Sequence, residues 1–181
     1  MLRQMTMMAA YNSWANRRLL DACQALSDSD LRAGLGAFFG SLHGTLNHML
    51  VADRLWLARL RGDPPPDLAL DAVLYERFAD LRAAREAEDQ RLGAHVSAMT
   101  PEALEAQITY RTVSKPATIT QPVWAALAHM FNHATHHRGQ CHAMLTRVAT
   151  QAPALDLIFF QRETGLGLKS VGDTADAPTR G

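Results

Sequence analysis

Cysteine is scarce in this sequence. Only two cysteines, Cys23 and Cys141, occur among 181 residues, and neither belongs to a C-x-x-C pair. Two isolated cysteines exclude the dense disulfide framework that stabilises small secreted domains. The pattern is typical of a protein from a reducing compartment, and we expect Cys141 to be a small residue of the core.

Excess charge of one sign and long apolar runs are also absent. Lys and Arg number 18 together, as do Asp and Glu, so the formal net charge is zero. The chain lacks the basic field that holds a nucleic-acid backbone or an anionic membrane surface. No uncharged apolar stretch reaches the roughly 18 residues that cross a bilayer, and the N-terminus does not resemble a signal peptide. We therefore predict a cytoplasmic protein with no nucleic-acid or membrane partner.

Apolar residues at helical spacing are abundant. Hydrophobic residues make up 48% of the chain, enough for the core of one domain. Their 3.6-residue period predicts four long helices, over residues 2–26, 41–61, 70–95 and 122–149. A shorter helix should begin at Pro153 and end near Thr164. The small polar residues 170–181 predict a flexible C-terminal tail after a single domain over residues 1–169.

The period of the pattern changes between the third and fourth helices. Residues 107–113 and 117–120 alternate with a period near two, with Ser114, Lys115 and Pro116 between them. This pattern predicts a small β-hairpin. The predicted fold class is therefore all-α, a four-helix bundle with a hairpin insertion before helix four and a short C-terminal helix. The long segment that contains the hairpin predicts one crossover connection between helices three and four.

The third helix carries a run of charged residues. We place Val73 and Leu74 in the core and interpret the charged run as a solvent-exposed face. Its members are Arg82, Arg85, Glu86, Glu88 and Arg91.

Five of the eight histidines fall within residues 129–142. On a wheel at about 100° per residue, His137 lies inside the apolar stripe of helix four and His133 lies beside it, one turn away. Burying an imidazole without a partner costs on the order of 1–3 kcal/mol, and a divalent metal would satisfy both rings. His48 on helix two is the best-placed third nitrogen donor, whereas His43 lies on another side of that helix. The alternative is a set of core histidines that are hydrogen-bonded and hold no metal.

The remaining histidines of the segment have weaker cases. His129 and His136 could relay protons from the edge of the stripe, but a solvent-facing position is the favoured interpretation. His142 lies on the far side and should be exposed. A zinc protease of the H-E-x-x-H type is excluded, because Ala134 stands where that motif has its glutamate.

Several other polar or aromatic residues lie near these histidines on the wheels. Asp53 needs a buried partner, and an ion pair with an arginine such as Arg138 is the favoured interpretation over a role as base. Trp14 and Trp56 are more typical of core than of a pocket wall. Gln140 and Arg138 could order the site or a dimer surface.

Four segments resemble the DinB (damage-inducible) superfamily. They are N-H-A-T-H-H-R-G-Q at residues 132–140, L-N-H-M-L-V-A-D-R-L-W-L at residues 46–57, and the shorter segments 11–16 and 155–160. The resemblance implies a four-helix bundle with a long crossover, often dimeric. It also implies a divalent metal, zinc or nickel, held by three histidines, which here are His48, His133 and His137. Better-understood relatives are thiol-dependent transferases and isomerases.

Three neutral imidazoles would leave at least one coordination position of a metal open. The expected function is therefore a metal-dependent thiol transferase or hydrolase that acts on a small thiol or another small molecule. The resemblance implies that the protein is a homodimer. The first alternative is a non-catalytic, metal-stabilised dimeric module for stress response or interaction. The second is a structural bundle without a metal.

Overall fold

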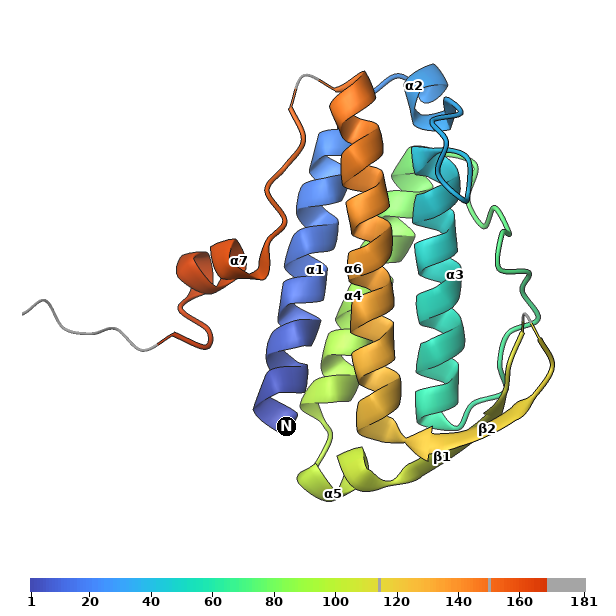
Figure 1. Cartoon of the computed structure of the whole chain (residues 1–181), viewed down its shortest axis with the longest axis vertical. Coiled ribbons are helices and arrows are strands. Elements are labelled where there is room, and N and C mark those ends of the chain that lie inside the picture. Colours follow the sequence, from blue (N-terminus) through green and yellow to red (C-terminus); the bar gives the residue numbers. More distant parts are fainter. Residues whose placement is uncertain (114, 150, 169–181) are drawn as a thin grey trace, which may run out of the picture.

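The computed structural model describes residues 1–113, 115–149 and 151–168. Its main body consists of four long helices packed side by side, as Figure 1 shows. They are α1 (Leu2–Gln24), α3 (Leu42–Arg61), α4 (Phe78–Ser97) and α6 (Val123–Val148). The shorter elements are α2 (Asp28–Arg32), α5 (Pro101–Glu105), β1 (Gln107–Arg111), β2 (Thr118–Pro122) and α7 (Leu157–Thr164). The predicted four-helix bundle with a hairpin and a short C-terminal helix is confirmed, and the predicted tail, residues 170–181, lies outside the described residues.

The ends of α3 follow directly from its sequence. The Ser41 side chain accepts a hydrogen bond from the Gly44 backbone N–H at the first turn, as serine does at helix N-termini. Gly62 ends the helix in the left-handed conformation with φ of 71°, which glycine adopts without steric cost. No helix in the described part of the chain is both long enough and apolar enough to span a bilayer.

Two clusters of buried residues show how the helices run. One cluster contains the end of α1, the start of α3, the start of α4 and the end of α6. The other contains the opposite ends of the same four helices. Helices α3 and α4 are therefore parallel to each other and antiparallel to α1 and α6. Residues 63–77 join two parallel helices, so this connection is the long crossover, which runs back along the bundle in Figure 1.

The crossover corrects two predictions about the third helix. The helix begins at Phe78 instead of residue 70, and the crossover precedes it instead of following it. The segment is held extended from α3, because the Asn47 side-chain oxygen accepts hydrogen bonds from the backbone N–H groups of Leu74 and Tyr75. Leu74 packs against the core as predicted, whereas Val73 is 47% exposed.

The charged run of α4 is only in part the exposed face that was predicted, because Glu86 and Arg91 are exposed and Arg82 is half-buried. Arg85 and Glu88 are buried, each only 2% exposed. Arg85 lies 2.7 Å from a carboxylate oxygen of Asp53 and 2.9 Å from one of Asp89. The partner of Asp53 is thus Arg85 instead of Arg138. The bundle interior therefore contains a compact group of opposite charges that sequence periodicity did not reveal.

Asparagines of α1 extend this buried group to α6. The amides of Asn12 and Asn16 donate to Asp89, and their oxygens accept from the guanidinium of Arg138. Arg138 is 2% exposed, so it belongs to the interior and not to a surface. Together with Asp53 of α3, the network links all four long helices across the centre of the bundle.

The β-hairpin and the C-terminal helix α7 pack on different parts of the bundle. Strands β1 and β2 form an antiparallel hairpin in which Thr109 pairs with Thr120. The hairpin lies where α3 ends and α6 begins (Figure 1). Helix α7 lies beside α1, where Phe160 packs edge-on against the rings of Tyr11 and Trp14. Trp14 is therefore a core residue, as predicted.

Candidate metal centre

Three imidazoles from two helices converge at one point between α3 and α6. The Nε2 atom of His133 lies 3.3 Å from Nε2 of His48 and 3.1 Å from Nε2 of His137. Each residue offers one nitrogen such that all three nitrogens lie within 4.8 Å of one another. The convergence predicted from the helical wheels is confirmed, while the role of these residues as metal ligands stays a prediction.

The outer nitrogens of two of these rings have fixed partners. Nδ1 of His48 lies 2.7 Å from the backbone oxygen of Leu70, which belongs to the crossover. Nδ1 of His137 lies 2.8 Å from the side-chain oxygen of Gln140. Because an oxygen of this kind only accepts, both Nδ1 atoms carry the hydrogen, and both Nε2 atoms present a lone pair. Gln140 thus orients His137, which is one of the two roles expected of it, and its role at a dimer surface stays a prediction.

This arrangement leaves the centre of the cluster short of hydrogen atoms. Neither His48 nor His137 has a hydrogen on Nε2, and His133 can supply at most one. At most one of the two short N···N contacts can therefore be a hydrogen bond. A cation between the three nitrogens would accept every lone pair at once. In known metal sites, a histidine usually donates its outer N–H to an oxygen, which turns its other nitrogen toward the metal. His48 and His137 have this arrangement.

The spacing of the nitrogens suits a first-row divalent metal. At a metal–nitrogen distance of 2.0–2.1 Å, two ligands of a tetrahedral ion lie about 3.3 Å apart, and adjacent ligands of an octahedral ion about 2.9 Å. The separation of 3.3 Å between His48 and His133 matches the tetrahedral value, and that of 3.1 Å between His133 and His137 lies between the two values. The third pair, His48 and His137, lies within 4.8 Å. The residues therefore fit a divalent ion, but the geometry does not choose between zinc and nickel.

The electrostatics of the cluster keep its rings neutral. Burial and, to a smaller extent, the neighbouring rings of His137 and His48 together lower the pKa of His133 to about 3. Burial likewise lowers the pKa of His48 and of His137, although their hydrogen bonds to Leu70 and Gln140 oppose the shift. Neutral imidazole is the form that binds metals, so the site is ready to do so at neutral pH.

An aromatic ring from the loop before α3 covers one side of the cluster. The ring of Phe39 stacks on that of His48 with centroids 3.7 Å apart and meets His137 edge-on. The backbone of this loop passes so close to α3 that a Cβ atom on Gly44 would overlap the carbonyl oxygen of Phe39. Glycine at position 44 is therefore required for Phe39 to reach the site, a signal that wheel analysis did not use.

The other histidines lie outside the cluster. His43 pairs with the backbone oxygen of Glu76, as expected for a residue on another side of α3. His129 and His136 are exposed, which agrees with the favoured interpretation. His136 accepts a hydrogen bond from the amide of Gln140. His142 is only half-exposed, because it lies beside the segment that precedes α7.

A cleft of about 380 Å³ opens directly beside the cluster. His48, His133 and Trp56 line it. Trp56 also packs against the core, as predicted, so this partly buried side chain belongs both to the core and to the wall of the cleft. Tyr110 of the hairpin, Arg59 of α3 and His129 of α6 are also among the residues that line it. Sequence reasoning did not identify Tyr110 and Arg59, although Arg59 lies three turns after His48 on the same face of α3.

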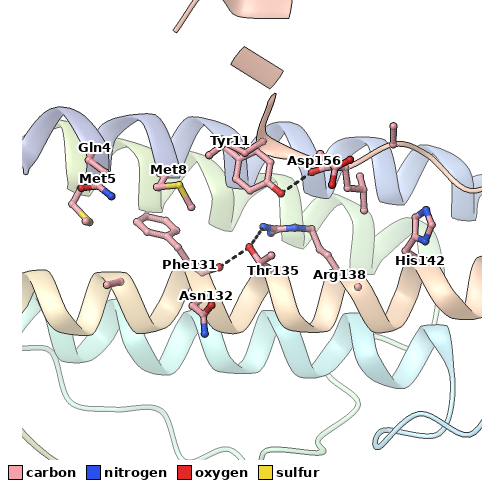
Figure 2. A pocket seen from close by; sticks show the side chains of 15 residues that line it. Gln4, Met5, Met8, Tyr11, Phe131, Asn132, Thr135, Arg138, His142 and Asp156 are labelled. Carbon is pink, nitrogen blue, oxygen red and sulfur yellow. Dashed lines mark hydrogen bonds between the residues drawn. The ribbon is translucent and has the colours of Figure 1, made fainter. Parts of the chain in front are cut away.

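A larger cleft, of about 670 Å³, lies on the other side of α6 between α1 and the segment that precedes α7. Figure 2 shows its apolar lining of Met5, Met8 and Phe131, together with Thr135 and Arg138. None of the three clustered histidines lines this cleft. The chemistry suggested by the cluster therefore belongs to the smaller cleft.

Comparison with known proteins agrees with this architecture. A family model described as the DinB family matches residues 1–172 of the chain. Protein DinB of Bacillus subtilis (strain 168) is 27% identical over 165 residues, an alignment that covers 85% of this chain and 92% of that protein.

Proposed function

This chain belongs to the DinB family, and we propose that it is a metal-dependent enzyme whose ion is held by His48, His133 and His137. The observation that carries the proposal is the convergence of three Nε2 atoms for which the chain supplies at most one hydrogen. A divalent ion held there would lower the pKa of a coordinated thiol or water and so provide a nucleophile at neutral pH. We propose thiol transfer as the reaction class, with hydrolysis as the variant that uses water.

The surrounding residues have separate tasks in this proposal. The backbone oxygen of Leu70 and the side chain of Gln140 hold two rings in the orientation that points Nε2 inward. Phe39 excludes water from the covered side of the cluster. The open side faces the cleft lined by Trp56 and Tyr110, so a small-molecule substrate can approach the ligands from that direction.

A cleft that reaches the clustered histidines favours an enzyme over a purely structural bundle. The cleft of about 380 Å³ beside the imidazoles would give a small molecule access to an ion held by them. Zinc and nickel are both proposed as the ion, because both accept three imidazoles. A homodimer, the assembly common in relatives, is proposed on the resemblance alone.

The test combines metal analysis with assays of turnover. The full chain, purified without a histidine tag, is loaded with zinc or nickel and assayed with small thiols plus electrophiles, and separately with esters and amides. We expect one bound ion per chain and turnover that disappears with a chelator. The variants His48→Ala, His133→Ala and His137→Ala should lose both ion and turnover.

His43→Ala is the matched control, because His43 lies on α3 but outside the cluster. It should retain the ion and the activity. Absence of a bound ion in the wild-type chain would overturn the metal site. A bound ion without turnover across both panels would favour a non-catalytic module.

A further inference from the structure

Arg59 occupies an unusual position in the cleft beside the histidine cluster. Its guanidinium carbon lies 4.7 Å from the ring centre of Trp56 and 4.5 Å from that of Tyr110. The two ring centres are 5.1 Å apart, so the three groups form a compact triangle. Both rings attract the cation through their π-faces. Arg59 is thus held in place against α3 and the hairpin.

The part of the chain that the structure describes offers no carboxylate to balance the charge of Arg59. Among residues 1–113, 115–149 and 151–168, no acidic side chain lies within ion-pair distance of Arg59. The residues that line the cleft include no Asp or Glu. By contrast, Arg61, two residues later, pairs with Asp63 at 2.8 Å. The cleft is therefore positive at the end that Arg59 provides, and an ion at the histidines would make it more so.

Most hydrogen-bond donors of Arg59 are free to bind a ligand. A guanidinium has five N–H groups in one plane. The structure gives Arg59 a single hydrogen bond, from Nη2 to the backbone oxygen of Arg111 at 3.0 Å. A purely structural role, in which Arg59 joins α3 to β1, would explain this hydrogen bond and the ring contacts. It would not explain why the guanidinium lacks an acidic partner. The planar donor set that remains suits the two oxygens of a carboxylate or phosphate.

We infer that Arg59 binds the anionic group, a carboxylate or a phosphate, of the small-molecule substrate. Trp56 and Tyr110 hold the guanidinium so that its donors meet this group at one end of the cleft. The histidine cluster then faces the reacting part of the same molecule at the other end. The placing of the reacting part rests on the proposed function, whereas the anion contact at Arg59 does not require a metal.

The experiment measures binding of matched probes to the full chain, both as purified and after loading with zinc. Benzoate, phenyl phosphate and the neutral benzamide are titrated at pH 7. Binding is followed by the NMR signal of the Trp56 indole N–H. The chain has only three tryptophans, so this signal is readily assigned. Metal content is determined on the same samples. Arg59→Gln removes the charge, and Arg59→Lys keeps the charge without the planar donor set.

We expect at least one of the two anions to bind the wild-type chain with an affinity about tenfold or more above that of benzamide. A hydrogen bond to a charged group contributes at least about a tenfold gain in affinity. Arg59→Gln should lose this preference, and Arg59→Lys should retain part of it. The matched control Arg61→Gln, which changes net charge equally, should leave it unchanged. The tighter of the two anions identifies the substrate group as carboxylate or phosphate.

Two results would overturn the inference. One is equal anion affinity in wild type and Arg59→Gln, and the other is failure of both anions to bind wild type better than benzamide. If Arg59→Gln only loosened the hairpin, its affinity for benzamide would fall as well. A loss of anion affinity with unchanged benzamide affinity is therefore specific to the charge of Arg59. Absence of a bound metal, with the anion preference intact, would overturn the proposed function and leave this inference standing.

Discussion

Replacing Arg85 by methionine tests whether the buried charges of the bundle are balanced as the structure shows. Arg85 is held between Asp53 and Asp89 at 2.7 and 2.9 Å. Its nitrogens have no hydrogen-bond partner of regular geometry, so the contact is one of charge at short range. The Arg85→Met variant would leave two buried carboxylates without their cation.

The expected loss follows from the cost of an unpaired buried charge. Removing one partner of a buried ion pair costs about 3–5 kcal/mol of unfolding free energy. For a chain of this size that corresponds to a fall in melting temperature of roughly 6–20 °C. The matched control is Arg82→Met on the same helix, because the carboxylates that Arg82 contacts are about half exposed. Exposed pairs contribute about 0–1 kcal/mol, so this control should change little.

The dependence on pH provides a second signature of the same perturbation. Burial raises the pKa of Asp53 and of Asp89, and the charge of Arg85 opposes that rise. Removing Arg85 should therefore raise both pKa values further. A carboxyl group whose pKa is higher in the folded state favours folding at low pH and loses that contribution as pH rises through the folded pKa. The deficit of Arg85→Met should thus grow between pH 4 and pH 7.

Urea unfolding followed by circular dichroism at pH 5 and pH 7 measures both effects. The reasoning fails if Arg85→Met loses no more stability than Arg82→Met does. It fails equally if the deficit of Arg85→Met is the same at the two pH values.

Two further predictions concern the histidine cluster. Gln140→Leu removes the acceptor that orients His137, so metal affinity should fall by about 10- to 100-fold in a chelator competition, and unchanged affinity would contradict that role. In the metal-free chain, His133 has a folded pKa of about 3 against an ordinary value of 6.5. Its contribution to stability should therefore be present above pH 6.5 and be lost as pH falls toward 3, by less than about 1.4 kcal/mol per pH unit because the ring is half-exposed. Urea unfolding at pH 7 and 5 should show a steeper loss for wild type than for His133→Gln, and equal slopes would contradict this assignment.

The histidine cluster was predictable from the sequence because helix geometry alone determines most of it. Residues four apart on a helix share a face, which fixes His133 and His137 relative to each other before any tertiary contact is known. The position of His48 on the inward face of α3 follows from the same periodicity. The one feature that the sequence does not determine locally is the packing of α3 against α6, which brings His48 to the other two histidines.

The start of α4 could not be predicted in the same way. Residues 70–77 have apolar spacing compatible with a helix, but Asn47 and His48 of α3 bind the backbone of this segment and hold it extended. These bonds join residues more than 20 positions apart, and no local pattern encodes them. Arg85 was misplaced for a related reason, because a charged side chain is typical of a surface until its buried partners are known.

Arg59 was missed although the sequence contains its spacing. His48, Trp56 and Arg59 fall on one face of α3, but a tryptophan there resembles core unless the hairpin that supplies Tyr110 is in place. Eleven residues of helix separate His48 from Arg59, or about 16 Å along the axis. The Arg59 side chain leans toward the N-terminal end of the helix, as side chains on helices do, and so shortens the gap toward the histidines. A molecule that touches both ends of the cleft must therefore span several bonds between its anionic group and its reacting atom, whereas a probe of the size of benzoate reaches only one end.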